Sequence, residues 1–392
     1  MDFFYVIFIQ LIVIGLLNYF CNSAGVKNRK YLYYLWGYHL LFCLIFWYYV
    51  NNYGGDALIY WQIQPGQLQK YLSQGPGTGF MFVLNYPLVI HLGLSFLSGS
   101  ILYASVGFLG FLFLYLSIVE IIETNIRVAS INFFPFILFL PNLHFWSSGV
   151  SKDSLIFFGI GLFLFSTLKP FKRLFGIVFS LSLIYFLRPH ITIFLLVSFG
   201  IGFLLDNKMK ASVKIILSIS MLAAAVFIFA DVMKFLKLDE LSSENIEQFS
   251  TTRVSNLSRS HTGSSVDISS YGLPLKIFTF VYRPLFFDVR NITALFASIE
   301  NLLILVLTFK LFQQNPLKAF LKAPYQVKGF LLFFLLASLS FSSILGNLGI
   351  MMRMKIMVMP ALLVFLFWSF TYEKALRIKK TGFFKKHKKF AV

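Results

Sequence analysis

Five short polar motifs interrupt an otherwise apolar chain and carry the residue types that could do chemistry. They occupy residues 54–60, 144–153, 188–190, 282–284 and 353–355. Ionisable groups at the ends of membrane helices are costly to remove from water, so they are typical of functional sites. We therefore predict that the five motifs converge on one site.

Asp56 is the only carboxylate in the segment 51–97. Two glycines before it permit a tight turn, and a helix that begins here would hold Asp56 in its first turn. The carboxylate could act as the general base for an acceptor hydroxyl or as a ligand of a divalent cation, and no other cofactor is expected. The alternative is a solvent-exposed residue at a helix start. Tyr60 and Trp61, one turn later, are candidate substrate-binding residues.

The segment 146–154 opens a long apolar run. Ser151 can cap a helix that begins there, and the free backbone N–H groups of a helix start attract anions. Lys152 beside them could bind phosphate, with Trp146 and Asp153 as further candidates for substrate binding. In the alternative, Lys152 extends toward water and Asp153 only offsets its charge.

Arg188 and Arg283 each precede a proline. Proline ends a helix and fixes the turn, and an arginine held by such a turn suits bidentate binding of an oxyanion. His190 and Tyr282 flank the two arginines and are candidate substrate-binding residues. In the alternative, Arg283 pairs with a nearby acidic residue such as Asp288.

Arg353 and Lys355 begin the last apolar run. Because they are two residues apart, their side chains would point to different faces of one helix. We expect one of them to face the site and the other to extend along the surface toward water.

The composition excludes most soluble classes of protein. The chain has 392 residues, of which 58% are hydrophobic and 12% are charged. A soluble domain carries about 25% charged residues, so a polytopic membrane protein is predicted. The net charge of +19 comes from short loops and from the tail 373–392, which suits anionic lipid and not nucleic acid. Cys21 and Cys43 are interpreted as apolar packing residues instead of a disulfide.

Apolar runs of about 17–25 residues each span a bilayer as a helix. We therefore predict an all-α, polytopic transmembrane helix bundle over residues 1–372 with a basic cytoplasmic tail over residues 373–392. About eleven such runs are found by length and hydropathy. They are residues 3–20, 31–50, 98–120, 129–145, 154–168, 174–187, 191–205, 213–231, 292–312, 329–347 and 355–372.

Basic loops alternate with these runs, and six of them fall on one side if the N-terminus lies on the other. Retained positive charge marks the cytoplasmic side, so we predict an outer N-terminus and a cytoplasmic C-terminus. The polar motifs and the long loops 51–97 and 232–291 then lie outside. Within these loops, 80–97 is interpreted as a re-entrant or interfacial helix, 273–287 as an interfacial segment and 238–270 as a mobile lid or linker.

The motifs and their order resemble those of bacterial polysaccharide polymerases of the Wzy and EpsG type, which make O-antigen or exopolysaccharide, and more distantly the GT-C class of membrane glycosyltransferases. The resemblance is carried by Gly55-Asp56-x-x-x-Tyr60, the segment 145–153, Arg188-Pro189, Arg283-Pro284 and the segment 347–360. One departure from the GT-C pattern is that the acidic residue is single and follows the second apolar run instead of the first.

The resemblance implies a glycosyltransferase of the bacterial inner membrane that acts on polyprenyl-diphosphate-linked glycans at the outer face, as repeat-unit polymerase of a surface polysaccharide. It implies Asp56 as the base, and Arg188, Arg283 and Arg353 as ligands of the lipid-linked diphosphate. The expected partners are a polyprenyl-linked oligosaccharide, the lipid bilayer and polysaccharide-assembly proteins. The alternatives are a GT-C-type transferase of single sugars from a polyprenyl-phosphate donor, a transporter or flippase of lipid-linked oligosaccharide, and a non-enzymatic assembly subunit.

Overall fold

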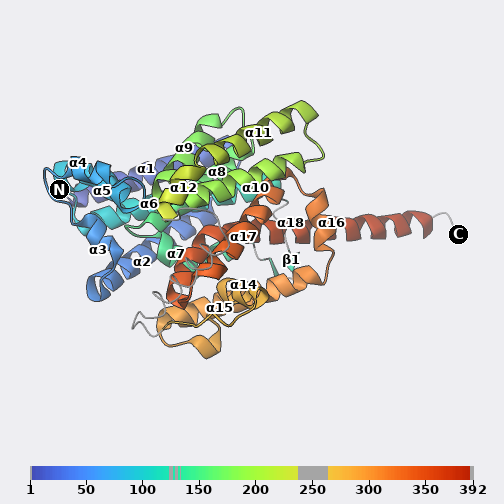
Figure 1. Cartoon of the computed structure of the whole chain (residues 1–392). Helices are drawn as coiled ribbons and strands as arrows, with labels where there is room; N and C mark the ends of the chain where they lie inside the picture. The colour runs from blue at the N-terminus through green and yellow to red at the C-terminus, as the bar shows by residue number, and fades with distance from the viewer. Residues whose placement is uncertain (1, 123–126, 129–130, 133, 237–263, 389–392) are drawn as a thin grey trace.

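The computed structural model describes residues 2–122, 127–128, 131–132, 134–236 and 264–388, and these are mostly helical (Figure 1). The composition predicts this, since a continuous apolar run satisfies its backbone in a membrane by forming a helix. Two short strands, β1 Arg127–Val128 and β2 Ile131–Asn132, pair antiparallel. Most of the predicted lid or linker, residues 238–263 of 238–270, lies outside the described residues.

Five of the described helices are long and apolar enough to cross a membrane. Two bent pairs of helices raise this number to seven if each pair is one span. The predicted class, a multi-pass all-α membrane protein, is therefore confirmed. Helix length and apolar composition identify five to seven candidate spans, fewer than the eleven or so predicted. The five helices are α1 Asp2–Ser23, α6 Phe96–Ile121, α15 Ile292–Phe312, α17 Tyr325–Ile344 and the part Leu348–Arg377 of α18. The bent pairs are α7 Pro141–Ser147 with α8 Lys152–Thr167, and α11 Ala211–Phe227 with α12 Phe229–Leu236.

The other described helices are shorter or more polar. At a rise of about 1.5 Å per residue, α9 and α10 measure about 21 and 24 Å, less than the hydrocarbon core of about 30 Å. The predicted re-entrant or interfacial helix is α5 followed by the π-helical turn η1, and the pair is too short to count as a span. These elements are α2 Lys30–Tyr53, α3 Asp56–Trp61, α4 Leu68–Ser73, α5 Thr78–Tyr86, η1 Pro87–His91, α9 Leu174–Leu187, α10 Pro189–Leu204, α14 Leu273–Tyr282, η3 Phe286–Asp288 and α16 Pro316–Lys322.

The prediction of a single helical span over 129–145 is wrong. The chain there forms a short 3₁₀ helix, η2 Phe136–Phe139, and then α7. Pro135 stands directly before η2, and Pro141 is the first residue of α7. A proline cannot donate the backbone hydrogen bond that a longer helix needs.

This irregular segment nevertheless runs from one end of the bundle to the other. Phe134 stacks on Tyr115 near the end of α6, with ring centroids 5.3 Å apart. Trp146, at the other end, lies beside Arg353, whose guanidinium is 5.8 Å from the ring. Irregular backbone is tolerated at membrane depth when protein covers it, and the side chains of Ile137 and Leu138 are buried.

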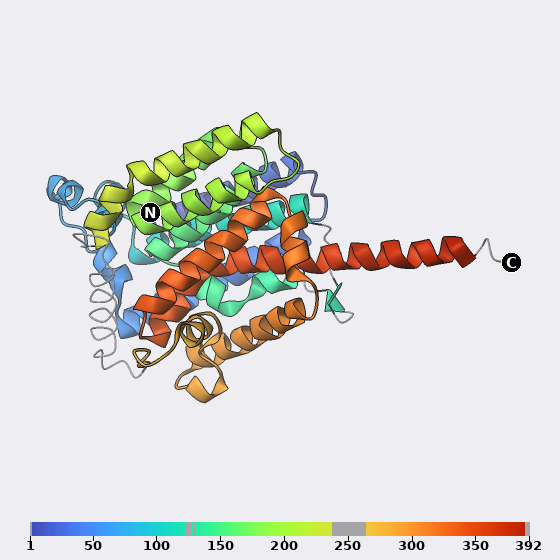
Figure 2. The same ribbon diagram turned by 45° about the vertical axis from the view of Figure 1, so that its right-hand side comes forward.

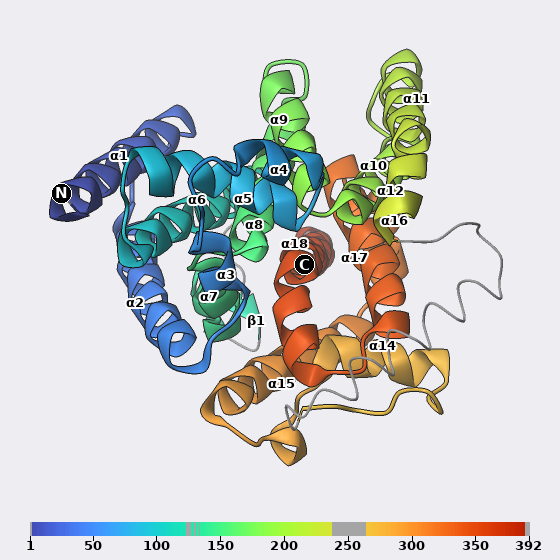
Figure 3. The same ribbon diagram turned by 60° about the vertical axis from the view of Figure 1, so that its left-hand side comes forward.

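Glycines allow the central helices to pack backbone against backbone. A Cβ atom on Gly161 of α8 would lie 2.5 Å from the carbonyl oxygen of Gly110 in α6. A Cβ atom on Gly202 of α10 would lie 3.0 Å from the Cα of Gly329 in α17. Small residues at such crossings are typical of membrane helix bundles. Seen along the bundle, α18 lies end-on between α8 and α17 and contacts both (Figure 3).

The two ends of the bundle differ in chemistry. Basic loops gather at the end where α16 lies and α18 emerges (Figures 1 and 2), and Glu120 pairs there with Lys169 and Arg173. The polar motifs lie at the opposite end with α3, as the charge pattern predicts. Helix α18 continues to Lys388, through the boundary predicted at residue 372.

Candidate functional site

The site is built on the start of α8. Ser151 caps this helix as predicted, because its hydroxyl accepts a hydrogen bond of 3.1 Å from the N–H of Ser154. The chain turns by 112° between α7 and α8. Gly149 fits in this turn because a Cβ atom there would lie 2.1 Å from the ring of Phe46. The turn therefore holds Asp153, the second residue of α8, fully inside the protein.

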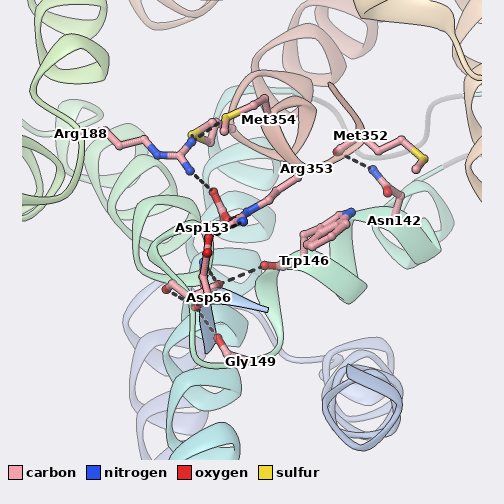
Figure 4. A network of polar contacts seen from close by, with 12 residues as sticks. Asp56, Asn142, Trp146, Gly149, Asp153, Arg188, Met352, Arg353 and Met354 are labelled. Atoms are coloured by element: carbon pink, nitrogen blue, oxygen red, sulfur yellow. Dashed lines mark hydrogen bonds and ion pairs between the residues drawn. The ribbon is translucent and has the colours of Figure 1, made fainter. Parts of the chain in front are cut away.

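Asp153 is the counterion of two arginines (Figure 4). One carboxylate oxygen lies 2.9 Å from Nη2 of Arg188, and the other accepts a hydrogen bond from Nε of Arg353. Arg188 also directs Nη1 at the sulfur atoms of Met354 and Met357, at 2.7 and 3.3 Å. Breaking a buried, hydrogen-bonded ion pair leaves an uncompensated charge, so this network fixes α8, α10 and α18 at one point.

Asp56 lies at the solvent side of the same network. Its carboxylate is 3.0 Å from Nη1 of Arg353, and half of its side chain is exposed. Helix α3 begins at Asp56 as predicted, and Gly54 and Gly55 precede it with φ of 76° and 138°. Residues with a side chain rarely adopt such values, so the turn that presents Asp56 requires these glycines.

Lys152 points away from Asp153. Its Nζ donates to the hydroxyl of Thr78 at 3.0 Å and lies 5.4 Å from the centroid of the Tyr60 ring. Asp153 pairs with Arg188 and Arg353. The alternative in which Asp153 only offsets the charge of Lys152 is therefore wrong.

Arg283 forms a bidentate pair with Asp288. This is the alternative that the sequence left open beside oxyanion binding. The two N–O distances are 3.0 and 2.5 Å. The hydrogen bonds to Asp288 raise the pKa of Arg283. Burial acts to raise the pKa of Asp288, but the hydrogen bonds from Arg283 and from the N–H of Leu285 outweigh it and hold that pKa below its usual value.

Lys355 corrects one prediction. It lies on a different face of α18 from Arg353, as expected, but it does not extend toward water. Its side chain is buried, and Nζ donates to the carbonyl of Arg283 and to Oδ1 of Asn301. The reason is that the residues after α14 and the helix α15 cover this face of α18.

Two cavities adjoin at Arg353. The larger has a volume of about 590 Å³ and the smaller about 220 Å³. Both are lined by Arg353, Trp146 and Tyr49. Arg283, Arg290 and Asp288 also line the larger cavity, whereas Asp56 lines the smaller. The larger cavity thus has three arginines and one carboxylate in its lining, and the smaller has Arg353 and Asp56.

The structure brings some predicted site residues together and leaves others apart. Arg188 and Arg353 meet on Asp153, and Arg353 shares the larger cavity with Arg283, but Arg188 lines neither cavity. Of the predicted substrate-binding residues, only Trp146 lines these two cavities. Tyr60, Lys152 and Asp153 lie in or beside the charged network, and the other three pack in the bundle. Trp61 packs against Gly99, His190 lies among aromatic rings that include Phe235, and Tyr282 packs on Phe278.

The sequence analysis did not name several lining residues as candidates, among them Tyr49 and Arg290. Tyr49 lies near the end of α2, a few residues before Asp56, and Arg290 follows Arg283 in the same loop. Their only signal was proximity to a ranked motif, since aromatic and basic residues are frequent throughout the chain.

The fold and the site define a multi-pass membrane protein with a charged network and two joined cavities at one end of its bundle. No protein-family model, curated protein or solved structure matches this chain. Among the described residues, no three His, Cys, Asp or Glu side chains gather as metal ligands.

Proposed function

We propose that this protein is a membrane glycosyltransferase that transfers a glycan from a polyprenyl diphosphate, as repeat-unit polymerase of a bacterial surface polysaccharide. The single observation that carries the proposal is the pair of cavities joined at Arg353. One of them presents the carboxylate of Asp56, and the other is lined by Arg283, Arg290 and Arg353. Transfer to a hydroxyl from a lipid diphosphate needs both chemistries side by side.

In the proposed reaction, the acceptor hydroxyl lies in the smaller cavity and attacks the anomeric carbon of the donor glycan. A new C–O bond forms, and the bond from the anomeric carbon to the diphosphate oxygen breaks. Asp56 takes the hydroxyl proton. The leaving diphosphate keeps the electron pair, and the arginines of the larger cavity stabilise its charge, since cations aimed at developing charge lower a barrier. The alternative role of Asp56, as a ligand of a divalent cation, is compatible with this proposal.

The shared aromatic wall suits sugar binding. Trp146 and Tyr49 present apolar ring faces with polar edges, and such side chains bind amphipathic ligands. The guanidinium of Arg353, 5.8 Å from the Trp146 ring, is held at this wall. In this proposal the transferred sugar lies against the wall, between the base and the diphosphate.

We propose that about eleven segments cross the bacterial inner membrane, with the site at the outer face. The support is that the irregular segment of η2 and α7 runs from one end of the bundle to the other, and that α2, α9 and α10 each connect the two ends. Positive loops at the opposite end then lie in the cytoplasm. A polyprenyl donor would reach the site from the lipid phase.

The test is replacement of the cations. We expect Arg283→Ala to lower polymer synthesis in cells by about 100-fold or more, which is the usual cost of losing one charge-stabilising donor. Arg188→Ala should lower it indirectly, because Asp153 loses a buried partner and the network that holds Arg353 is disturbed. Arg173→Ala is the matched control, because Arg173 is a partly buried arginine paired with Glu120 at the opposite end. Equal expression is checked by immunoblot. Unchanged polymer length in Arg188→Ala and Arg283→Ala would refute the proposed function.

The lipid-linked intermediates of a deletion strain separate the candidate functions. Complete single repeat units at the outer face indicate a polymerase. Incomplete units indicate a transferase of single sugars, and complete units retained at the inner face indicate a flippase. The polymerase is favoured because the charged groups gather at one end of the bundle, whereas a transporter needs a path between both faces.

A further inference from the structure

A buried polar cluster lies behind the Arg283 wall of the larger cavity. Nζ of Lys355 donates to the carbonyl of Arg283 and, at 3.0 Å, to Oδ1 of Asn301. Nδ2 of Asn301 donates to the carbonyl of Pro284 at 2.8 Å. Two consecutive carbonyls are therefore held by side chains of α18 and α15.

The same cluster reaches the aromatic wall. Glu300, the neighbour of Asn301 on α15, accepts a hydrogen bond from the N–H of Asn142 at the start of α7. The side-chain amide of Asn142 donates to the carbonyl of Met352 on α18 at 3.1 Å (Figure 4). Helix α7 carries Trp146, α18 carries Arg353, and Arg283 follows α14. The cluster therefore connects the three segments that supply these lining residues.

The cluster is costly to bury. The exposed fractions of Lys355, Asn301 and Glu300 are 2%, 4% and 5%. A cation inside a membrane helix is expensive, and neutral donors could satisfy the same carbonyls. The carboxylate of Glu300 offsets part of this cost electrostatically, but Nζ of Lys355 is directed at the carbonyl of Arg283 and at Asn301.

We infer that Lys355 and Asn301 are positioning residues that fix Arg283 in the cavity for the diphosphate. The inference rests on the proposed function. Holding the carbonyls of Arg283 and Pro284 fixes the backbone from which the guanidinium extends to Asp288. Since Lys355 is two residues from Arg353, it also fixes the spacing of the two arginines.

The experiment uses the full chain in lipid nanodiscs, with inorganic diphosphate as the probe and its dissociation constant as the readout. Lys355→Met and Asn301→Leu should each weaken binding by about tenfold, because misplacing a binding group by about an ångström has effects of this order or larger. Lys355→Arg, which keeps a cationic donor, should restore most of the affinity. In an Arg283→Ala background, Lys355→Met should have no further effect, since both changes act through one group.

Lys328→Met is the matched control. Lys328 is also a buried lysine that donates to a backbone carbonyl, that of Leu205 at 2.6 Å, but it lies at the opposite end of the bundle. We expect this variant to lower thermal stability and to leave diphosphate affinity unchanged.

Each contrary outcome has a distinct meaning. Wild-type diphosphate affinity in Lys355→Met and Asn301→Leu, with weak binding in Arg283→Ala, would overturn this inference alone. The same holds if Lys355→Met weakens binding equally with and without Arg283. Wild-type affinity in Arg283→Ala would remove the basis of the proposed function as well. If Lys355→Met does not fold, Asn301→Leu decides the matter by the same measurement.

Discussion

Arg353 binds two carboxylates that differ in their surroundings. Asp153 is fully buried and holds Arg353 from the protein side, whereas Asp56 is half exposed and lies at the mouth of the smaller cavity. An exposed ion pair contributes up to about 1 kcal/mol, whereas removal of one partner from a buried pair costs about 3–5 kcal/mol. We therefore expect the phosphate of the proposed substrate to replace the Asp56 contact but not the Asp153 contact.

Replacing Asp56 should separate binding from turnover. We expect Asp56→Asn to abolish the proposed glycan transfer, because the variant lacks the proposed base. We also expect it to bind inorganic diphosphate up to about fivefold more tightly, because Arg353 loses a competing carboxylate whose exposed pair contributes up to about 1 kcal/mol. The measurements are polymer synthesis in cells and calorimetric titration of the purified protein.

Asp153→Asn is the matched control for this prediction. It removes the other carboxylate of Arg353 and leaves two arginines without their buried counterion, so it should lower the unfolding free energy by about 3–5 kcal/mol. Asp56→Asn should leave thermal stability nearly unchanged. Polymer synthesis at the wild-type rate in Asp56→Asn would exclude Asp56 as the base.

Local signals could be predicted from the sequence, whereas long-range contacts could not. The turn before Asp56 and the cap at Ser151 depend on neighbours within three residues, and both were predicted. Lys355 was misplaced because its partner Asn301 comes from a helix 54 residues earlier. The packing of Trp61 on Gly99 could not be predicted either, because the two residues are far apart in the sequence.

Among the helices, regular apolar runs were predicted well. The spans predicted at 174–187 and 292–312 coincide with α9 and α15. The span predicted at 129–145 failed because hydropathy averages over a run and does not weigh Pro135 and Pro141, which stop a helix locally. The chain still reaches the other end, since burial inside the bundle replaces the missing regular hydrogen bonding.

The turn after α14 should respond to pH through Asp288. In the folded protein its pKa lies below the usual value of 3.8, so this carboxylate stabilises the fold above that value and ceases to do so as the pH falls through the folded pKa. We expect wild-type protein to lose more thermal stability than Asp288→Asn between about pH 6 and pH 3. Thermal unfolding in detergent is the measurement, and parallel pH curves for the two proteins would contradict the assignment.

Considered as a whole, the molecule has two groups of charged residues at opposite ends of its bundle. The basic loops gather at the end where Lys169 and Arg173 pair with Glu120, and they account for much of the net charge of +19. At the opposite end, Arg188, Arg283 and Arg353 are held by carboxylates, and Arg290 lines the larger cavity. Because the basic loops dominate the net charge, its sign does not indicate what binds at the site. The charged residues that line the cavities are the relevant ones.

Labelling of intact cells tests which end faces outward. Gln69 of α4 lies at the site end and Lys318 of α16 lies at the basic end, and both side chains are exposed. The native Cys21 and Cys43 are buried, so background labelling will be low. A membrane-impermeant maleimide should modify Gln69→Cys in intact cells but reach Lys318→Cys only after permeabilisation, because retained basic loops mark the cytoplasmic side. The reverse pattern would place Asp56 and the arginines in the cytoplasm, where assembly of a surface polymer at this site could not take place.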